Sequence, residues 1–127
     1  MITQTITLPK FTTAGVHTLP NTGDIRHFII SVHADASTTA TIRVKGSAIE
    51  APPDFSAAST SSNDWDYLAI RELATANIIA GATGATVSAS TIHKLYEVEC
   101  NGLNHFGIDV SSISGDGITV NVFLKQE

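Results

Sequence analysis

The sequence predicts an all-β domain, an antiparallel β-sandwich of jelly-roll-like type with about eight to ten short strands. Apolar and polar residues alternate with period two in several segments, which is typical of strands with one buried face. Clusters of Gly, Asn, Asp and Pro separate these segments at short intervals, and no segment shows a convincing amphipathic helix. A chain of 127 residues is the size of one domain, so we expect residues 1–127 to share one core.

The first two expected strands are short. Met1 to Leu8 alternates Ile and Leu with polar residues and ends at Pro9. Gly15 to Leu19 is a second candidate, closed by a Pro-Asn-Thr-Gly turn at residues 20–23.

Two longer strands follow, and we interpret them as a hairpin. Ile25 to Ala34 places Phe28, Ile30 and Val32 on one face. After a turn at residues 36–38, the segment Thr39 to Lys45 points Ala40, Ile42 and Val44 inward. The outward residues of this second strand include Arg43 and Lys45, which we expect on a solvated face.

Residues 46–64 interrupt the pattern. They contain Pro52-Pro53 and a run of Ser, Ala and Thr without periodicity, so we expect one long connection. Loops of this length in a small domain are either functional or flexible, and the sequence leaves both readings open.

The alternation resumes after the loop. Trp65 to Leu73 is expected to form a strand with apolar residues on both faces, and Asn77 to Ala80 a short strand or edge. A helical reading of Glu72 to Ala80 is less favoured because Ile78 and Ile79 are β-branched and a glycine follows. Ala85 to Ser90 is another weak strand.

The last third of the chain has the clearest pattern, with three consecutive antiparallel strands expected between His93 and Lys125. An Asn101-Gly102 turn separates the first two, and the glycine-rich residues 114–117 separate the last two. The residues expected to share the buried faces are Tyr96, Val98, Cys100, Phe106, Ile108, Val110, Ile118, Val120, Val122 and Leu124.

Composition excludes several classes of function. A net charge of −5 with scattered basic residues argues against binding to nucleic acid. The single Cys100 cannot form an internal disulfide and lies in the apolar register, so we expect a buried thiol. The first residues show no basic segment followed by an apolar run, and no window has eighteen apolar residues, so neither a secretory signal nor a membrane span is expected. The low charged fraction of 15 % suits contact with another protein surface.

The sequence contains no recognisable catalytic or metal-binding motif, so we expect neither an enzyme nor a cofactor. There is no Gly-x-Ser-x-Gly motif and no phosphate-binding glycine loop followed by Lys. The acidic pairs Asp64/Asp66 and Glu97/Glu99 are better explained as solubilising charges. His27 and His33 would lie about 20 Å apart along one strand, too far to share a metal ion.

Carbohydrate binding is the main alternative, because sugar-binding modules often use exposed aromatic rings on a β-sandwich. The candidates are Trp65, Tyr67 and Tyr96. Both tyrosines fall in core-like registers, whereas Trp65 either forms an exposed platform or caps one end of the core.

Motifs in the second half carry a family resemblance. They are the pattern Trp65-x-Tyr67-Leu68-x-Ile70-x-Glu72-Leu73, the turn Gly81-x-Thr83-Gly84, and Tyr96-Glu97-Val98 followed by Asn101-Gly102-Leu103. With Val110, Ser114-Gly115 and the Thr119-Val120 strand, they cover about half of the chain. This half resembles small β-sandwich virion proteins of tailed bacteriophages, such as capsid decoration (cement) proteins and related head or tail accessory proteins.

The resemblance implies a protein made in the host cytoplasm and carried on the capsid surface of the virion. It implies binding to the major capsid protein as a homo-oligomer, with a trimer favoured and a dimer possible. Because the N-terminal segment and the long loop lack a core pattern, we expect them to make the contacts. The candidate partner-binding residues are Pro52, Pro53, Phe55, Ser59 and Trp65. The alternative is a carbohydrate- or receptor-binding module of a phage tail or secreted protein.

Overall fold

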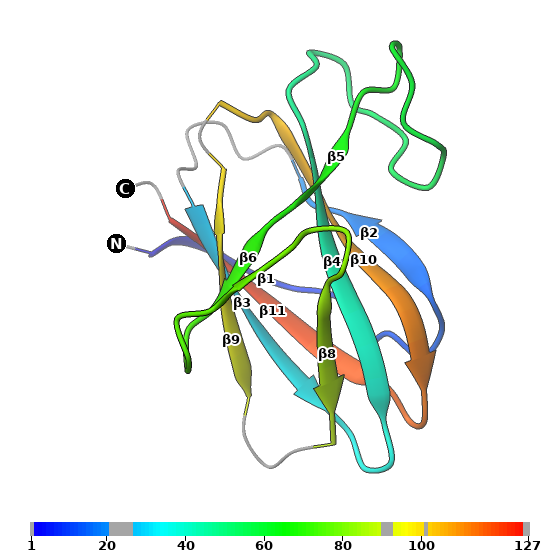
Figure 1. The fold of residues 1–127 in the computed structure, drawn as a ribbon, viewed down its shortest axis with the longest axis vertical. Helices are drawn as coiled ribbons and strands as arrows, with labels where there is room; N and C mark the ends of the chain where they lie inside the picture. Colours follow the sequence, from blue (N-terminus) through cyan, green and yellow to red (C-terminus); the bar gives the residue numbers. More distant parts are fainter. Residues whose placement is uncertain (1, 21–26, 90–92, 101, 126–127) are drawn as a thin grey trace.

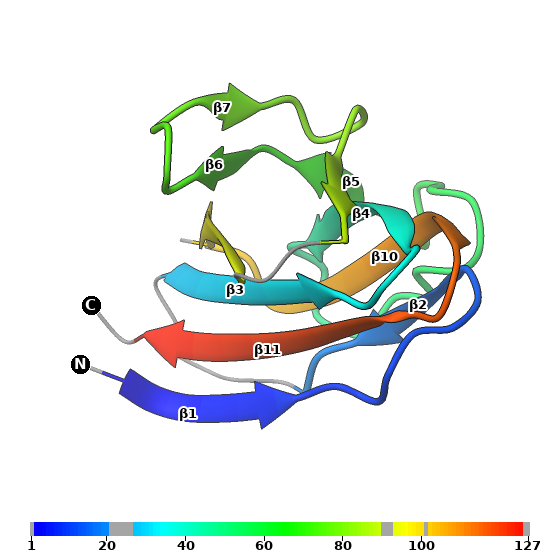
Figure 2. The ribbon, with the colours of Figure 1, turned by 90° about the horizontal axis from the view of Figure 1, so that it is seen from below.

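A computed structural model describes residues 2–20, 27–89, 93–100 and 102–125. It confirms the expected fold class: two antiparallel sheets pack face to face as a β-sandwich (Figures 1 and 2). No helix in the described ranges could cross a membrane.

The strands are short and follow the segments of alternating residues. Their bounds are β1 Ile2–Thr7, β2 Gly15–Thr18, β3 His27–Ala34, β4 Thr39–Ser47, β5 Asp66–Leu68, β6 Ile70–Glu72, β7 Ile78–Ile79, β8 Ala85–Ser88, β9 Lys94–Glu99, β10 His105–Ser114 and β11 Ile118–Lys125.

Among the described residues, one sheet has six strands in the order β1-β11-β3-β9-β6-β7. The other has the order β2-β10-β4-β5, and β8 pairs with the part of β4 that β5 leaves free. The first strand therefore pairs with the last one, and Figure 2 shows β1 and β11 side by side in the six-stranded layer.

The core lies between the two sheets. In β11 buried and partly exposed residues alternate strictly, as expected from the sequence. Phe28 of β3 meets Phe106 of β10 edge-on with 5.4 Å between ring centroids, which ties the two layers together. Tyr96 and Cys100 are buried, as expected. Full burial of each large apolar side chain contributes about 1.5–3 kcal/mol, so this layer is the main source of stability.

The expected hairpin of β3 and β4 is wrong. β3 pairs with β11 and β9, whereas β4 pairs with β10, β5 and β8 in the opposite sheet. The turn between them carries the chain from one layer to the other. Both strands still bury their apolar faces, because Ile30 and Ile42 approach the same core from opposite sides. Alternation alone specifies a buried face but not which strand is the neighbour.

The expected strand from Trp65 to Leu73 is also divided. β5 belongs to the five-stranded sheet and β6 to the six-stranded sheet, and Ala69 lies at the crossing. This change of sheet explains the apolar residues on both faces of the segment. The expected strands at Asn77–Ala80 and Ala85–Ser90 are confirmed in shorter form as β7 and β8.

The three strands expected in the last third are present as β9, β10 and β11. Their expected pairing as consecutive antiparallel neighbours is wrong, because the chain crosses to the other sheet after each strand and none of the three pairs with the next. The turn before β11 is fixed by Thr38, whose Oγ1 accepts hydrogen bonds from the backbone N–H groups of Asp116 (2.9 Å) and Gly117 (3.0 Å). Gly115 in this turn has φ +101°, and a Cβ there would lie 2.3 Å from the carbonyl oxygen of Ser37. Only glycine is tolerated at such a position.

Candidate interaction surface on the five-stranded sheet

Residues 48–65 form a loop that covers part of the outer face of the five-stranded sheet. The loop connects β4 to β5 and projects beyond the strands in Figure 1. Its effect is visible in β10, where the first six residues are all buried although only every second one faces the core. His105 and Asp109 are among these buried residues. The loop therefore forms a second, smaller packed layer outside the sandwich.

Lys45 lies at the centre of this layer. Its Nζ donates a hydrogen bond to the backbone oxygen of Phe55 (2.7 Å) and lies 4.1 Å from the centroid of the Trp65 ring. The carboxylate of Asp109 is 4.0 Å away. The expectation that Lys45 faces solvent is wrong, since only 6 % of the residue is exposed. Its outward position on β4 becomes buried because the loop that follows β4 folds back over it.

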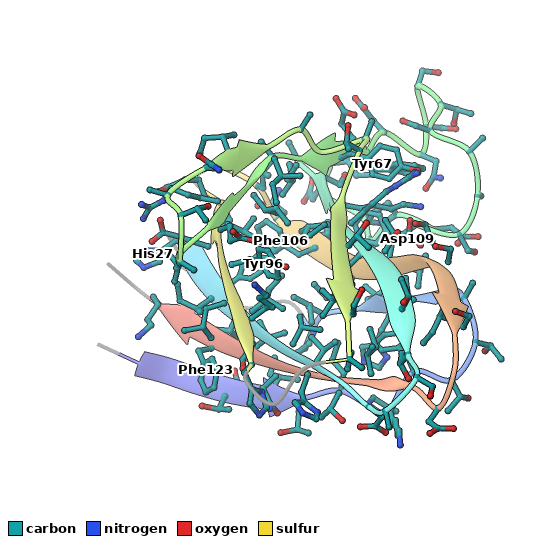
Figure 3. All side chains as sticks on the ribbon, turned by 60° about the horizontal axis from the view of Figure 1, so that its bottom comes forward. His27, Tyr67, Tyr96, Phe106, Asp109 and Phe123 are labelled. Atoms are coloured by element: carbon teal, nitrogen blue, oxygen red, sulfur yellow. The ribbon has the colours of Figure 1, made fainter. Side chains whose placement is uncertain are left out.

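Two aromatic rings, those of Trp65 and Tyr67, lie near the ammonium group, and the Phe55 ring packs beside Trp65. Trp65 packs edge-on against Phe55 and Tyr67, with 6.4 Å and 5.2 Å between centroids. Arg43 lies over the Tyr67 ring at 5.0 Å and donates from Nη1 to its hydroxyl oxygen (3.2 Å). Figure 3 shows Tyr67 and Asp109 on the loop side of the molecule, with Tyr96 and Phe106 in the core between the sheets. Rings on cations of this kind contribute about 0.5–2 kcal/mol each. We call Arg43, Lys45, Phe55, Trp65, Tyr67 and Asp109 the loop cluster.

Gly107 makes room for this cluster. A Cβ at this position of β10 would lie 2.9 Å from Cδ2 of Phe55. The ring therefore rests directly on the strand backbone. A glycine inside a strand is a known sign of close approach by another group, so Gly107 between Phe106 and Ile108 is a sequence signal that could have indicated the covered face of β10.

The loop is also held by its own hydrogen bonds. Asn63 accepts from the backbone N–H of Asp54 (2.7 Å) and donates from Nδ2 to the oxygens of Asp54 (2.9 Å) and Ala58 (3.1 Å). Trp65 donates from Nε1 to the oxygen of Ala57 (3.0 Å). Hydrogen bonds from the Ser56 hydroxyl and N–H lower the pKa of the Asp54 carboxyl below its usual value.

The residues expected to bind a partner occupy different layers of this loop. Pro53 and Phe55 are buried, and Trp65 is partly buried. Pro52 and Ser59 are exposed, and the Ser59 hydroxyl bonds the backbone of Trp65. The structure thus brings Phe55, Ser59 and Trp65 together. The two aromatic residues support the loop from beneath, and its outer surface is made of small polar and acidic side chains.

The outer surface of the loop is acidic. Residues 48–66 contain Glu50, Asp54, Asp64 and Asp66, all exposed, and no Lys, Arg or His. Lys45 and His105, which bond the loop backbone at Phe55 and Glu50, are both buried beneath the loop. A partner that contacts this surface therefore meets negative charge, hydroxyl groups and methyl groups.

Other ionisable groups lie outside this layer. In the parts of the chain that the structure describes, no group of three or more His, Cys, Asp or Glu residues could hold a metal ion. The rings of His33 and His93 lie 5.0 Å apart, and His33 is 3.7 Å from Asp35. Burial, with a smaller effect of Glu99, raises the pKa of the Cys100 thiol to about 11.

The fold has a counterpart among solved structures. No family model matches the chain, and no curated protein matches it. The crystal structure of the SPBc2 prophage-derived protein YomS superposes with a TM-score of 0.61 at 13 % identity, covering 98 % of this chain and 98 % of that chain. At this identity the likeness establishes a shared fold along the whole length of both chains.

Proposed function

We propose that this chain is a non-enzymatic structural protein of a bacteriophage virion that binds the outer surface of the assembled capsid and stabilises it. The observation that carries the proposal is the loop of residues 48–65, which is fixed on the sandwich by a buried cation and aromatic rings. The likeness to a prophage-derived protein supports a phage origin.

The construction of the loop supports a binding role. A loop already held in one conformation loses little conformational entropy when it binds, so more of the contact energy appears as affinity. Lys45, Phe55 and Trp65 supply that fixation from beneath, and the residues above them remain free to contact a partner. The exposed carboxylates of Asp64 and Asp66 favour a basic patch on the capsid surface.

Stabilisation of the capsid would follow from binding alone. A protein that binds only the assembled, expanded shell stabilises it by RT ln(1 + [L]/Kd) per site, about 3 kcal/mol at a hundredfold excess over Kd. Many equivalent sites make a modest contact sufficient. No catalytic step is needed.

The geometry disfavours the alternative of carbohydrate binding at Trp65. The Lys45 ammonium lies 4.1 Å from the centroid of the Trp65 ring, and the rings of Phe55 and Tyr67 pack edge-on against the indole. The indole N–H is also used within the loop. A sugar-binding platform needs a free aromatic face, and here the ring serves the loop itself.

The test uses particles of the phage whose genome encodes the chain, prepared without it. Purified chain is added and particle binding is followed by co-sedimentation. A double variant, Ala58→Arg with Ser61→Arg, places two bulky cations on the exposed loop surface. We expect the variant to fold normally and to lose most particle binding.

Thr86→Arg is the matched control, because Thr86 is exposed on β8, away from the loop. Wild-type chain that fails to bind particles would contradict the proposed function. Equal binding by the loop variant would contradict the assignment of the surface. Light scattering checks the expected oligomer, which should have the mass of three or two chains of 13.4 kDa.

A further inference from the structure

A pocket lies at the β6–β7 end of the six-stranded sheet, where the chain crosses from β5 to β6. Its volume is about 390 Å³, and it is lined by residues 68–71, Ile78, Glu97 and Glu99. Arg71 pairs across the strands with both Ile78 and Glu97, so these three side chains share the outer face of the sheet. A volume of this size accommodates one large apolar side chain.

Ile78 exposes an unusual amount of apolar surface at this pocket. Its relative exposure is 67 %, whereas its neighbour Ile79 packs against the core. Among the described residues only one other large hydrophobic residue, Leu95, is exposed, at 42 %. A β-branched side chain at the rim of an apolar pocket is a ready contact for a partner.

The strand that carries Ile78 is also the edge of its sheet. β7 is the last strand in the order, and no strand of the described residues pairs with its outer side (Figure 2). An unpaired edge offers backbone N–H and C=O groups to an incoming extended segment. Because β7 has only two residues, few such bonds can form, and side-chain contacts must supply most of the affinity.

The charge at the pocket defines the partner further. Arg71 is already engaged, since its Nε and Nη2 donate to Oε1 of Glu97 at 3.1 Å and 2.5 Å. Glu99 has no ion-pair partner within the described ranges, although it lines the same pocket. The pocket therefore keeps one uncompensated negative charge in a chain whose net charge is −5. A cationic side chain next to an apolar one would satisfy both features.

We propose that this pocket and the edge of β7 bind an extended segment of a protein partner in which a large apolar residue stands beside Lys or Arg. The segment adds to β7 as a further strand. Its apolar side chain packs over Ile78 into the pocket, and its long Lys or Arg side chain extends across the pocket toward Glu99. The edge of β7 belongs to the other sheet from the one that the loop covers, and this contact does not depend on the proposed capsid function.

The test is an array of ten-residue peptides probed with the full chain. The central residue is Phe, Leu or Ala and its neighbours are Lys, Thr or Glu, in a background of Thr and Val. We expect binding to peptides with a central Phe or Leu flanked by Lys, with Kd below about 1 mM by fluorescence polarisation. Peptides with a central Ala or flanking Glu should bind at least about tenfold more weakly.

Variants locate the site. Ile78→Asp should weaken binding of the Lys-flanked Phe peptide about tenfold, and Glu99→Gln about threefold, with the Glu99→Gln effect reduced at high salt. Leu95→Asp is the matched control, because it places the same charge at the other exposed apolar residue and should change nothing. Failure of every array peptide to bind would overturn the proposal, and so would equal binding by Ile78→Asp or by Glu-flanked peptides.

Discussion

The outer faces of the two sheets differ in a way that β10 and β11 make visible. Along β11 every second residue is partly exposed, so one face of the six-stranded sheet is open to solvent. In the first half of β10 both faces are buried, because the loop of residues 48–65 covers the outer one. Each sheet carries a cation on this face: Lys45 is buried beneath Trp65, whereas the Arg71 side chain is 41 % exposed beside Glu97.

This difference shows that a residue on the outward face of a strand can still be buried when a loop covers that face. An ion pair in water contributes little, with a median below about 1 kcal/mol. Removing a buried cation that donates a hydrogen bond and has aromatic neighbours lowers stability more, because its buried polar partners are then left unpaired. The two cations therefore allow the covered and the open face to be compared by single substitutions.

Lys45→Met should have the largest effect. The substitution keeps the stem of the side chain but leaves the Phe55 carbonyl without its donor and the buried Asp109 without its cation. We expect a loss of about 2–4 kcal/mol in the free energy of unfolding, measured by urea denaturation. A loss below about 1 kcal/mol would mean that the covered face behaves like the open one.

Gly107→Ala should come next, because the new Cβ would lie 2.9 Å from the Phe55 ring. We expect the loop to shift and stability to fall by about 1–3 kcal/mol. Trp65 is the single tryptophan of the chain, so its fluorescence reports the shift directly. Gly15→Ala is the control, since nothing lies within 4 Å of a Cβ there. A native spectrum for Gly107→Ala would show that the loop is not packed on the strand.

High pH should lower the free energy of unfolding by an intermediate amount. The group concerned is Cys100, which lies in the core beside a residue of the open face. Cys100 points inward and its neighbour Glu99 is exposed. Burial raises the pKa of the thiol from 9.0 to about 11, so the folded state holds this proton more tightly than the unfolded state does. The resulting stability is fully present below pH 9 and is lost as pH rises through about 11.

We expect a loss of about 1–2 kcal/mol from this group between pH 8 and pH 11, followed by urea midpoints. Cys100→Ala should flatten the decline, although it lowers stability at every pH by removing buried volume. Tyr96, whose pKa burial raises to about 12, adds a later decline that both proteins share. An equally steep decline in Cys100→Ala between pH 9 and pH 10 would contradict the assignment to the thiol.

Arg71→Met should have the smallest effect. The Arg71–Glu97 pair lies on the open face, so we expect a change of at most about 1 kcal/mol, smaller still in 0.5 M salt. Thermal melts at two salt concentrations measure it. A loss as large as that of Lys45→Met would erase the distinction between the two faces.

The sequence predicted which residues face the core better than it predicted which strands pair with one another. Period-two alternation identified the buried residues of β3, β4 and β11, because burial of one face depends only on the local pattern. The same pattern could not decide that β3 and β4 lie in opposite sheets, since pairing depends on residues far apart in sequence. The division of Trp65–Leu73 into β5 and β6 escaped prediction for the same reason.

The loop cluster as a packed unit was not predicted. Two of its members, Phe55 and Trp65, were expected as contacts to a partner, and the structure brings their rings together. The burial of Lys45 was missed, because its charge and its outward position both indicate solvent. Gly107 was an unused signal of the covered face, because a glycine within an otherwise regular strand indicates that another group packs directly on the backbone.

The pairing of β1 with β11 has a consequence for synthesis on the ribosome. Each of the three strands β9, β10 and β11 returns to a sheet begun much earlier, and β1 acquires its partner only when residues 121–125 have been made. Until then the nascent polypeptide must keep its apolar faces from aggregating. Topologies of this kind acquire their native contacts slowly, over milliseconds to seconds. We expect folding to complete in one late cooperative step once β11 has left the exit tunnel.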